Sequence, residues 1–342
     1  MIKLAISGAG AIVERAHIPA FLSVPEIEVV AIQSRTIEKA ERVAAAIVSK
    51  PRTYRDYDEM LAREHPDAVG IFTPNALHCA CTLKAVAAGA HVLVEKPIAP
   101  TLTEARQMVD AALQANRVLT VAMQRRFGGL ERAIKRALES GAIGRPHFIR
   151  SRLSHGGPEF WAPGQNWFFE RADAGGGAML DLGVHVADLA RWFTGEVDSV
   201  SGQVATLGKT IAVEDNGLAM LKFRSGALGV IEASWTSRPA LSATEIFGSE
   251  GRIMAGYPRL DIAVLRADGS PVAGFEREEI MKTFDPRDLL APSRELARTF
   301  VDAIAGKCAP DPAGEDGLRA IEIIEAAYRA SASGGVIKLP LA

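Results

Sequence analysis

A glycine-rich turn, placed directly after the first apolar stretch, constrains the fold of this chain more than any other feature. Residues 2–7 read Ile-Lys-Leu-Ala-Ile-Ser, and Gly8-Ala9-Gly10-Ala11-Ile12-Val13 follows before a helical pattern begins. Gly8 permits a tight turn, and Gly10 lets the backbone approach a pyrophosphate at a helix N-terminus. Val13 replaces the usual third glycine, which loosens helix packing more than it weakens phosphate binding. We therefore expect a dinucleotide site formed by Gly8, Gly10, Ala11 and Ile12.

Strand and helix patterns alternate over the first third of the chain. Apolar stretches predict strands at residues 2–7, 28–33, 67–72, 91–95 and 119–122, and helical patterns lie at 37–46, 77–88 and 103–115. This alternation is typical of a parallel sheet with crossover helices. We expect an α/β fold in which residues 1–123 form an NAD(P)-binding Rossmann domain with a doubly wound parallel sheet.

The pattern changes after Arg126. Strand-like runs lie at 147–152, 197–206, 217–223, 227–234, 243–247 and 261–265, and helical patterns at 178–193, 294–305 and 315–332. Short turns such as Arg224-Ser225-Gly226-Ala227 indicate hairpins. Residues 124–342 are therefore expected to form an α+β substrate and oligomerisation domain with an open, largely antiparallel sheet. Self-association would cover the exposed sheet face, so we expect a homodimer or homotetramer.

The end of the second predicted strand bears on cofactor choice. The stretch Ile32-Gln33-Ser34-Arg35-Thr36 lacks the acid that usually accepts from the ribose 2′-hydroxyl of NAD. Ser34 and the planar guanidinium of Arg35 suit a 2′-phosphate instead. We expect NADP to be preferred over NAD. The alternative is that Arg35 is solvated or stacks on adenine.

Four further motifs stand in both halves of the chain. They are Thr73-Pro74-Asn75 with His78, Glu95-Lys96-Pro97, Arg126-Phe127, and Gly175-Gly176-Gly177 leading into Asp181, Gly183, His185 and Asp188. Together they resemble the glucose–fructose oxidoreductase and inositol dehydrogenase (Gfo/Idh/MocA) family over essentially the whole chain. The resemblance implies nicotinamide-dependent hydride transfer at a carbinol of a sugar, polyol or diol. It also implies catalytic roles for Lys96, Asp181 and His185, and a cis peptide before Pro97.

The residues themselves favour the same chemistry. Lys96 follows the carboxyl end of a predicted parallel strand, where α/β sheets bind ligands, and its amine can donate to a carbonyl oxygen under reduction. Asp181 and His185 stand four apart on a predicted helix and share a face. Histidine titrates near physiological pH, so His185 is the expected general acid and base, with Asp181 holding the substrate or tuning the imidazole. The alternatives are a structural Lys96–Glu95 ion pair and a structural Asp181–His185 pair.

Two further groups complete the expected site. Against the cofactor we expect Thr73, Pro74, Asn75, His78, Glu95 and Lys96. Against the substrate we expect Arg126, Trp161 and Trp167, because aromatic rings stack on sugar C–H faces; the alternative for the tryptophans is packing. Gln124 departs from the resembled family, whose members often carry Asn before the Arg-Phe pair.

Composition excludes several other classes. A net charge of -2 without basic clusters argues against nucleic-acid and membrane partners. Seven scattered histidines and three cysteines form no metal-ligand set and no disulfide framework, and no apolar run approaches a membrane span. We expect a cytoplasmic enzyme without a metal and without a signal peptide. The rival functions are NAD-dependent glycoside hydrolysis through transient oxidation, and a nucleotide-binding sensor without catalysis.

Overall fold

The structure, a computed structural model, describes residues 1–257, 261–283, 285 and 288–341. The chain forms two compact units: Met1–Gln124 with Leu290–Leu318, and Arg125–Leu289 with Arg319–Ala342. The first division falls between Gln124 and Arg125. Residues 290–318, however, belong to the first unit and not to the second. The reason is that helix α10 (Ala291–Ile304) packs against α1 (Ile18–Leu22), where Arg298 pairs with Glu26 at 2.7 Å.

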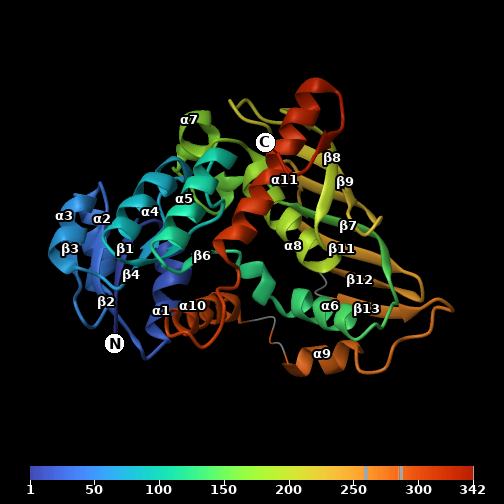
Figure 1. The fold of residues 1–342 in the computed structure, drawn as a ribbon, viewed down its shortest axis with the longest axis horizontal. Helices are drawn as coiled ribbons and strands as arrows, with labels where there is room; N and C mark the ends of the chain where they lie inside the picture. The colour runs from blue at the N-terminus through green and yellow to red at the C-terminus, as the bar shows by residue number, and fades with distance from the viewer. Residues whose placement is uncertain (258–260, 284, 286–287, 342) are drawn as a thin grey trace. The chain divides into compact units, whose positions relative to one another are not determined.

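The first unit contains a six-stranded, wholly parallel sheet in the order β3-β2-β1-β4-β5-β6 (Figure 1). Its strands are β1 (Ile2–Ser7), β2 (Ile27–Gln33), β3 (Arg52–Tyr54), β4 (Ala68–Ile71), β5 (His91–Val94) and β6 (Leu119–Val121). The doubly wound Rossmann sheet predicted from the sequence is confirmed. The prediction missed β3 and helix α3 (Tyr57–Glu64), because a three-residue strand is too short to show a periodicity.

Helices connect these strands at positions that follow from local sequence. They are η1 (Val13–His17), α1, α2 (Ile37–Ala45), α3, η2 (Asn75–Leu77), α4 (His78–Ala87) and α5 (Leu102–Gln114). Thr101 caps α5 by accepting from the Glu104 backbone N–H at 3.3 Å, and Asp56 caps α3 through the Glu59 N–H at 2.7 Å. Such caps satisfy N–H groups that have no partner within the helix.

The second unit contains an eight-stranded sheet in the order β13-β12-β11-β7-β10-β9-β8-β14. Its strands are β7 (Pro146–Ser154), β8 (Val197–Ala205), β9 (Asn216–Phe223), β10 (Leu228–Ser234), β11 (Leu241–Gly248), β12 (Gly251–Tyr257), β13 (Asp261–Arg266) and β14 (Ile337–Lys338). Among the described strands only β7 and β10 pair in parallel, so the open, largely antiparallel sheet is confirmed. The predicted hairpin joins β9 to β10, with Gly226 at φ +88° in its turn.

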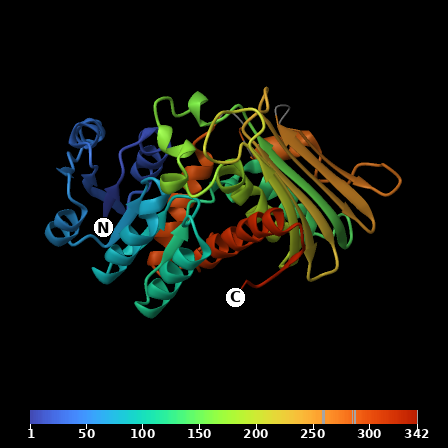
Figure 2. The ribbon, with the colours of Figure 1, turned by 90° about the horizontal axis from the view of Figure 1, so that it is seen from above.

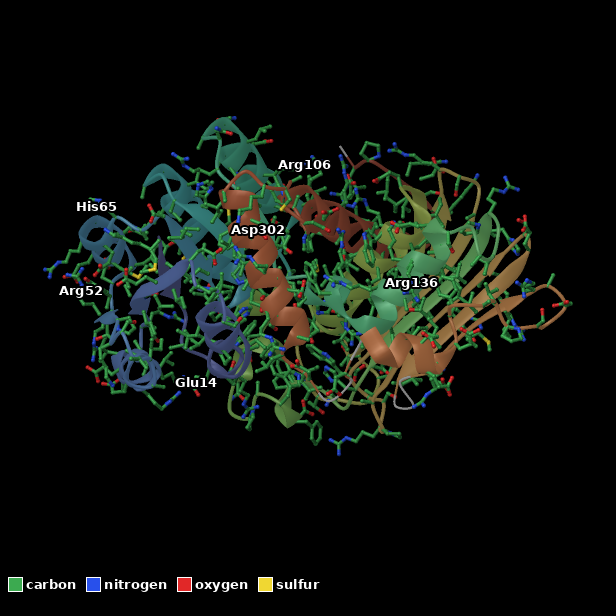
Figure 3. The ribbon with its side chains drawn as sticks, turned by 90° about the horizontal axis from the view of Figure 1, so that it is seen from below. Glu14, Arg52, His65, Arg106, Arg136 and Asp302 are labelled. Atoms are coloured by element: carbon green, nitrogen blue, oxygen red, sulfur yellow. The ribbon has the colours of Figure 1, made fainter. Side chains whose placement is uncertain are left out.

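Helices of the second unit lie along one face of this sheet (Figure 2). The helical segments of this unit are η3 (Gln124–Phe127) at its start, then α6 (Gly129–Glu139), η4 (Pro158–Phe160), η5 (Asn166–Phe169), α7 (Arg171–Ala174), η6 (Met179–Gly183), α8 (Val184–Thr194), α9 (Arg277–Thr283) and α11 (Gly314–Ser333). Helix α8 packs on β7 and β10, and α6 packs on β12 and β13. The facing sides of these elements hold the apolar core. Charged side chains such as Glu14, Arg52 and Arg136 lie on the surface (Figure 3).

Candidate active site

The glycine turn forms as predicted at the carboxyl end of β1. Gly8 has φ +110°, and a Cβ at this position would overlap the carbonyl oxygen of Phe72. The Phe72 N–H donates to the Ser7 carbonyl at 2.8 Å, which holds the two strand ends together. The helix that follows begins with the π-helical turn η1 instead of an α-helical turn. Only a glycine fits this approach, as a backbone cradle for phosphate requires.

The end of β2 presents Ser34 and Arg35. The Gln33 side chain points elsewhere: its Oε1 accepts from Ser7 Oγ and its Nε2 donates to the Arg55 carbonyl, both at 2.8 Å. Ser34 Oγ accepts from the Thr36 N–H at 3.2 Å. Arg35 is exposed and makes no ion pair within the part of the chain that the structure describes. The exposed Arg35 guanidinium therefore lies where the ribose end of a dinucleotide is expected.

Lys96 is the second residue after β5, and both carboxylate oxygens of the residue before it, Glu95, have partners. Glu95 is buried; its Oε2 accepts from the Lys96 N–H at 3.0 Å, and its Oε1 lies 2.7 Å from His17 Nε2. The peptide between Lys96 and Pro97 is cis, as the resemblance implied. His17 was not singled out from the sequence. Its place nine residues after Gly8, in the helix that opens at the glycine turn, is the only signal that points to it.

His78 occupies the start of α4 and is fully buried. Its Nδ1 lies 2.9 Å from the Pro97 carbonyl oxygen, and its Nε2 lies 3.0 Å from that of Thr73. Burial lowers the pKa of His78 in spite of these two carbonyls. His78 thus joins the loops that follow β4 and β5, the two segments expected to face the nicotinamide. Thr73 Oγ1, in the first of these loops, is buried and has no hydrogen-bond partner among the described residues.

In the second unit, Asp181 and His185 lie on one helical segment that is not a single α-helix. The predicted helix 178–193 begins as the π-helical turn η6, which carries Asp181, and continues as α8, which carries His185. Asp181, His185 and Asp188 are all buried. Residue spacing does not reveal a π-turn, because its i→i+5 bonding depends on what packs against it. Such turns occur frequently at functional sites.

Asp181 has a buried partner from the sheet. The Trp235 indole N–H donates to Asp181 Oδ2 at 3.1 Å, and Trp235 has no exposed surface. Phe169 packs edge-on against the indole at 6.1 Å between ring centroids. Trp235 was missed from the sequence because it follows β10 without any motif. Its N–H fixes the orientation of the carboxylate.

The glycine run before η6 is explained by Glu214. One carboxylate oxygen of Glu214 accepts from the N–H groups of Gly177 and Met179 at 2.8 and 3.1 Å, and from the Tyr328 hydroxyl at 2.6 Å. A Cβ at Gly177 would overlap the Glu214 carbonyl oxygen. Glu214 therefore caps the helix that carries Asp181 and His185.

Arg126 forms a buried, bidentate ion pair with Asp188. Arg126 Nε lies 2.9 Å from Oδ2 of Asp188, and Nη2 lies 2.5 Å from Oδ1. The guanidinium carbon also lies 5.7 Å from the centre of the Trp192 ring. Arg126 is only 4% exposed, so the pair fixes the segment after Gln124 to helix α8.

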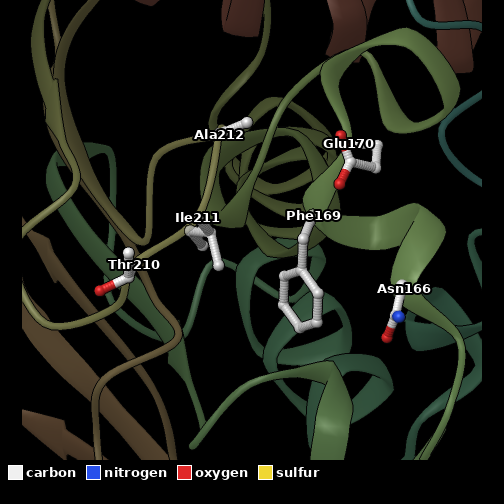
Figure 4. A pocket seen from close by; sticks show the side chains of 6 residues that line it. All are labelled: Asn166, Phe169, Glu170, Thr210, Ile211 and Ala212. Carbon is white, nitrogen blue, oxygen red and sulfur yellow. The ribbon is translucent and has the colours of Figure 1, made fainter.

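The loop before η6 carries the two predicted aromatic contacts. Trp167 stacks on Phe168 at 3.8 Å, while Trp161, 36% exposed, meets Phe168 edge-on at 5.0 Å. Beside these rings lies a hollow of about 390 Å³, within the usual range for small-molecule sites (Figure 4). It is lined by Asn166, Phe169, Glu170, Thr210, Ile211 and Ala212. Phe169, which lines the hollow, is also the residue that packs against Trp235.

Two structural features are absent from the residues that the structure describes. No group of three or more His, Cys, Asp or Glu side chains is arranged to hold a metal ion. No helix within the described ranges combines the length and apolar character needed to cross a membrane.

Family models match both units. The model described as an oxidoreductase family with an NAD-binding Rossmann fold matches residues 2–123, and the one described as the GFO/IDH/MocA C-terminal domain matches residues 132–254. Curated relatives include the 1,5-anhydro-D-fructose reductase of Ensifer adhaerens, 33% identical over 90% of both chains. Another is the myo-inositol 2-dehydrogenase of Thermotoga maritima, 29% identical over 84% of both.

Solved structures share the whole fold. The WlbA dehydrogenase from Bordetella pertussis, in complex with NADH and UDP-GlcNAcA, superposes with a TM-score of 0.91. It is 28% identical and covers 100% of this chain and 98% of its own. The likeness therefore extends over both units.

Proposed function

The chain belongs to the Gfo/Idh/MocA oxidoreductase family, and from this premise we propose that it interconverts a carbinol and a carbonyl on a sugar, polyol or related diol, with Lys96, Asp181 and His185 as catalytic residues. It is an NAD(P)-dependent oxidoreductase whose relatives are named dehydrogenases and reductases of such compounds. The observation that carries the assignment of residues is the buried Asp181, oriented by the Trp235 N–H one helical turn before a buried His185.

The chain's own groups supply proton transfer and charge stabilisation. The nicotinamide, when bound, supplies or accepts the hydride. His185 accepts the hydroxyl proton when the alcohol is oxidised and returns it when the carbonyl is reduced. The Lys96 amine donates to the same oxygen and stabilises the negative charge that develops there. Asp181, held by Trp235, orients the imidazole or a neighbouring hydroxyl.

The first unit fits a dinucleotide at two places. A Cβ at Gly8 would overlap the Phe72 carbonyl oxygen, so the tight turn after β1 requires a glycine, as a dinucleotide turn does. Thr73 Oγ1, which has no hydrogen-bond partner among the described residues, offers a hydrogen bond beyond β4. We propose that Gly8, Gly10, Ala11 and Ile12 hold the pyrophosphate. The nicotinamide side is assigned to the segments that contain Thr73, Pro74, Asn75, His78, Glu95 and Lys96.

The preferred cofactor is proposed to be NADP. The support is Arg35, exposed and without an ion pair among the described residues, together with Ser34 and the absence of an acid at the end of β2. The Gln33 side chain does not compete with Ser34 and Arg35 for the ribose end of the nucleotide, because it is hydrogen-bonded to Ser7 and to the Arg55 carbonyl. The WlbA dehydrogenase is described with NADH, so the two nucleotides must be compared directly.

The substrate is proposed to lie against the loop that holds Trp161 and Trp167. The exposed face of Trp161 and the hollow beside Phe169 suit a polyhydroxylated ring, with Asn166 and Glu170 as hydrogen-bonding groups. Arg126, also predicted to bind substrate, is proposed to act chiefly by holding α8 through Asp188.

Assembly through the second sheet is a further part of the proposal. Leu218, Met220 and Leu228 are about half exposed, on the same face of β9 and β10. Exposed apolar patches of this kind mark association surfaces, and homo-oligomers are usually symmetric. We propose a homodimer or homotetramer through this face. A cytoplasmic location is proposed because all three cysteines are free thiols.

The test is turnover of a substrate panel by the purified protein. Aldoses, inositols, anhydro sugars and vicinal diols are offered with NAD⁺ or NADP⁺, and the matching ketones with NADH or NADPH, while nicotinamide absorbance is followed. The expected result is net cofactor turnover with at least one polyhydroxylated substrate. Glycosides are included with product analysis. Release of a free sugar without net cofactor change would indicate the hydrolase, and nucleotide binding without turnover would indicate the sensor.

A further inference from the structure

A buried pair of ionisable side chains lies in the first unit, outside the three proposed catalytic residues. His17 is 3% exposed and Glu95 is 8% exposed, and their closest atoms, Nε2 and Oε1, are 2.7 Å apart. Buried charges are costly unless they are paired and hydrogen-bonded. The pair therefore needs a reason beyond packing.

The two oxygens of Glu95 have different partners. Oε1 meets the imidazole of His17, and Oε2 accepts the backbone N–H of Lys96 at 3.0 Å. A carboxylate held at both oxygens cannot rotate. The position of the Lys96 main chain is thus coupled to the imidazole on η1.

The charge state of Glu95 depends on the same contact. Burial raises its pKa, but the hydrogen bond from His17 and the charges of His17, Lys96 and His78 outweigh burial, so the pKa is lowered. Glu95 is therefore ionised at neutral pH. Without His17, the effect of burial on Glu95 would be offset less strongly, so the pKa of Glu95 would rise.

The imidazole is itself fixed by its neighbours. The His17 ring stacks on Phe72 at 3.8 Å between centroids and 6° between planes, and Phe21 flanks both rings. The Phe72 carbonyl is the group that abuts Gly8. His17 therefore connects the glycine turn, the end of β4 and the segment that follows β5.

We propose that His17 is a positioning residue for Lys96: it holds the Glu95 carboxylate in the single orientation that fixes the Lys96 main chain and places a negative charge beside the Lys96 amine. The imidazole itself does not touch the reacting atoms. This inference rests on the proposed function, in which Lys96 donates to the reacting oxygen.

The kinetic test compares His17→Leu, which removes the ring N–H, with His17→Gln, whose amide can still donate toward Glu95. His17→Leu should lower kcat about 10- to 100-fold, because a misplaced donor costs rates of this order. Nucleotide affinity and KM should change little. The acidic limb of the kcat profile should move to higher pH, and His17→Gln should recover most of the lost rate.

A double-variant cycle with Glu95→Gln separates positioning from fold stability. Adding His17→Leu to Glu95→Gln should cause little further loss of kcat, since both changes break the same connection. Phe72→Leu removes the stacking partner only, and should lower thermal stability while leaving the pH profile in place. Should His17→Leu fail to fold, the cycle is run with His17→Ala, which also removes the ring N–H. Losses that multiply, or a His17 variant with lowered stability and an unchanged profile, would overturn the proposal.

A spectroscopic readout keeps this inference distinct from the proposed function. In ¹H–¹⁵N spectra of the nucleotide-free protein, the Lys96 backbone amide signal should shift in both His17→Leu and Glu95→Gln, while that of Leu4 in β1 stays in place. This shift is expected even if no alcohol in the panel is turned over. An unmoved Lys96 amide in the His17 variant would refute the coupling regardless of activity.

Discussion

His185 lies in the first turn of α8 and carries proton transfer in the proposed reaction. Replacement by alanine should lower kcat about 10²–10⁴-fold, the usual contribution of a positioned acid–base group. Nucleotide affinity, measured by fluorescence quenching, should stay unchanged, because the dinucleotide residues belong to the other unit. The matched control is His147→Ala, an exposed histidine on β7. Loss of nucleotide binding in His185→Ala would instead identify a structural histidine.

Arg35 determines cofactor choice in the proposal. Arg35→Ala should weaken NADPH binding about tenfold or more, since a hydrogen bond to a charged group contributes about 1.5–3 kcal/mol. NADH binding should barely change, because NADH lacks the 2′-phosphate. Lys39→Ala, which removes an exposed cation in the first turn of α2, serves as the control. Equal losses for both nucleotides would remove the case for NADP.

At the scale of elements, the loop between β8 and β9 is organised by one carboxylate. Asp215 is fully buried and accepts from the N–H groups of Leu207, Gly208 and Lys209 at 2.7–2.8 Å. Burial raises its pKa, but these donors outweigh burial and lower it. This loop also supplies Thr210 and Ile211 to the hollow of Figure 4, so its order bears on substrate binding.

Asp215→Asn should therefore destabilise the second unit by about 1–3 kcal/mol at neutral pH, since the amide leaves buried donors unpaired. The difference in free energy of unfolding between wild type and variant is fully present above the ordinary aspartate pKa of about 3.9. It is lost as the pH falls through the lowered pKa that Asp215 has in the folded protein. Urea midpoints across a pH series measure this difference. Asp268→Asn, at an exposed turn where Asp268 also accepts a backbone N–H, should change the midpoint little. If the urea midpoints of the wild type and Asp215→Asn do not approach each other at acidic pH, ionised Asp215 does not have the stabilising role assigned to it.

At the scale of the whole molecule, the open sheet face predicts assembly. Met220→Glu places a charge at the centre of the half-exposed apolar group on β9 and β10, and it should lower the mass found by light scattering toward that of the monomer. Val48→Glu, at a 97% exposed apolar residue of the first unit, is the control and should leave the mass unchanged. A monomeric wild-type protein would end the assembly proposal.

The sequence alone was enough to predict both sheets and most of their strands, because a strand buried on one or both faces imposes a recurring apolar pattern on its residues. The Gly8 turn, the Rossmann sheet and the β9–β10 hairpin depend on local backbone demands and are visible in one dimension. Helix α6 was overlooked although Leu130, Ala133, Ile134 and Ala137 show the helical period. Strand β12 was missed because Gly251 and Gly256 weaken its apolar pattern.

Only the tertiary structure decided which partner each polar group receives. Glu95 meets His17, Asp181 meets Trp235 and Arg126 meets Asp188 across 54 to 78 residues of chain. Residues 290–318 likewise pack with the first unit because α10 covers α1. No local pattern specifies such pairs, because a buried hydrogen bond depends on how distant segments pack. The sequence therefore determined which side chains are proposed to react, and packing determined the groups that hold them in place.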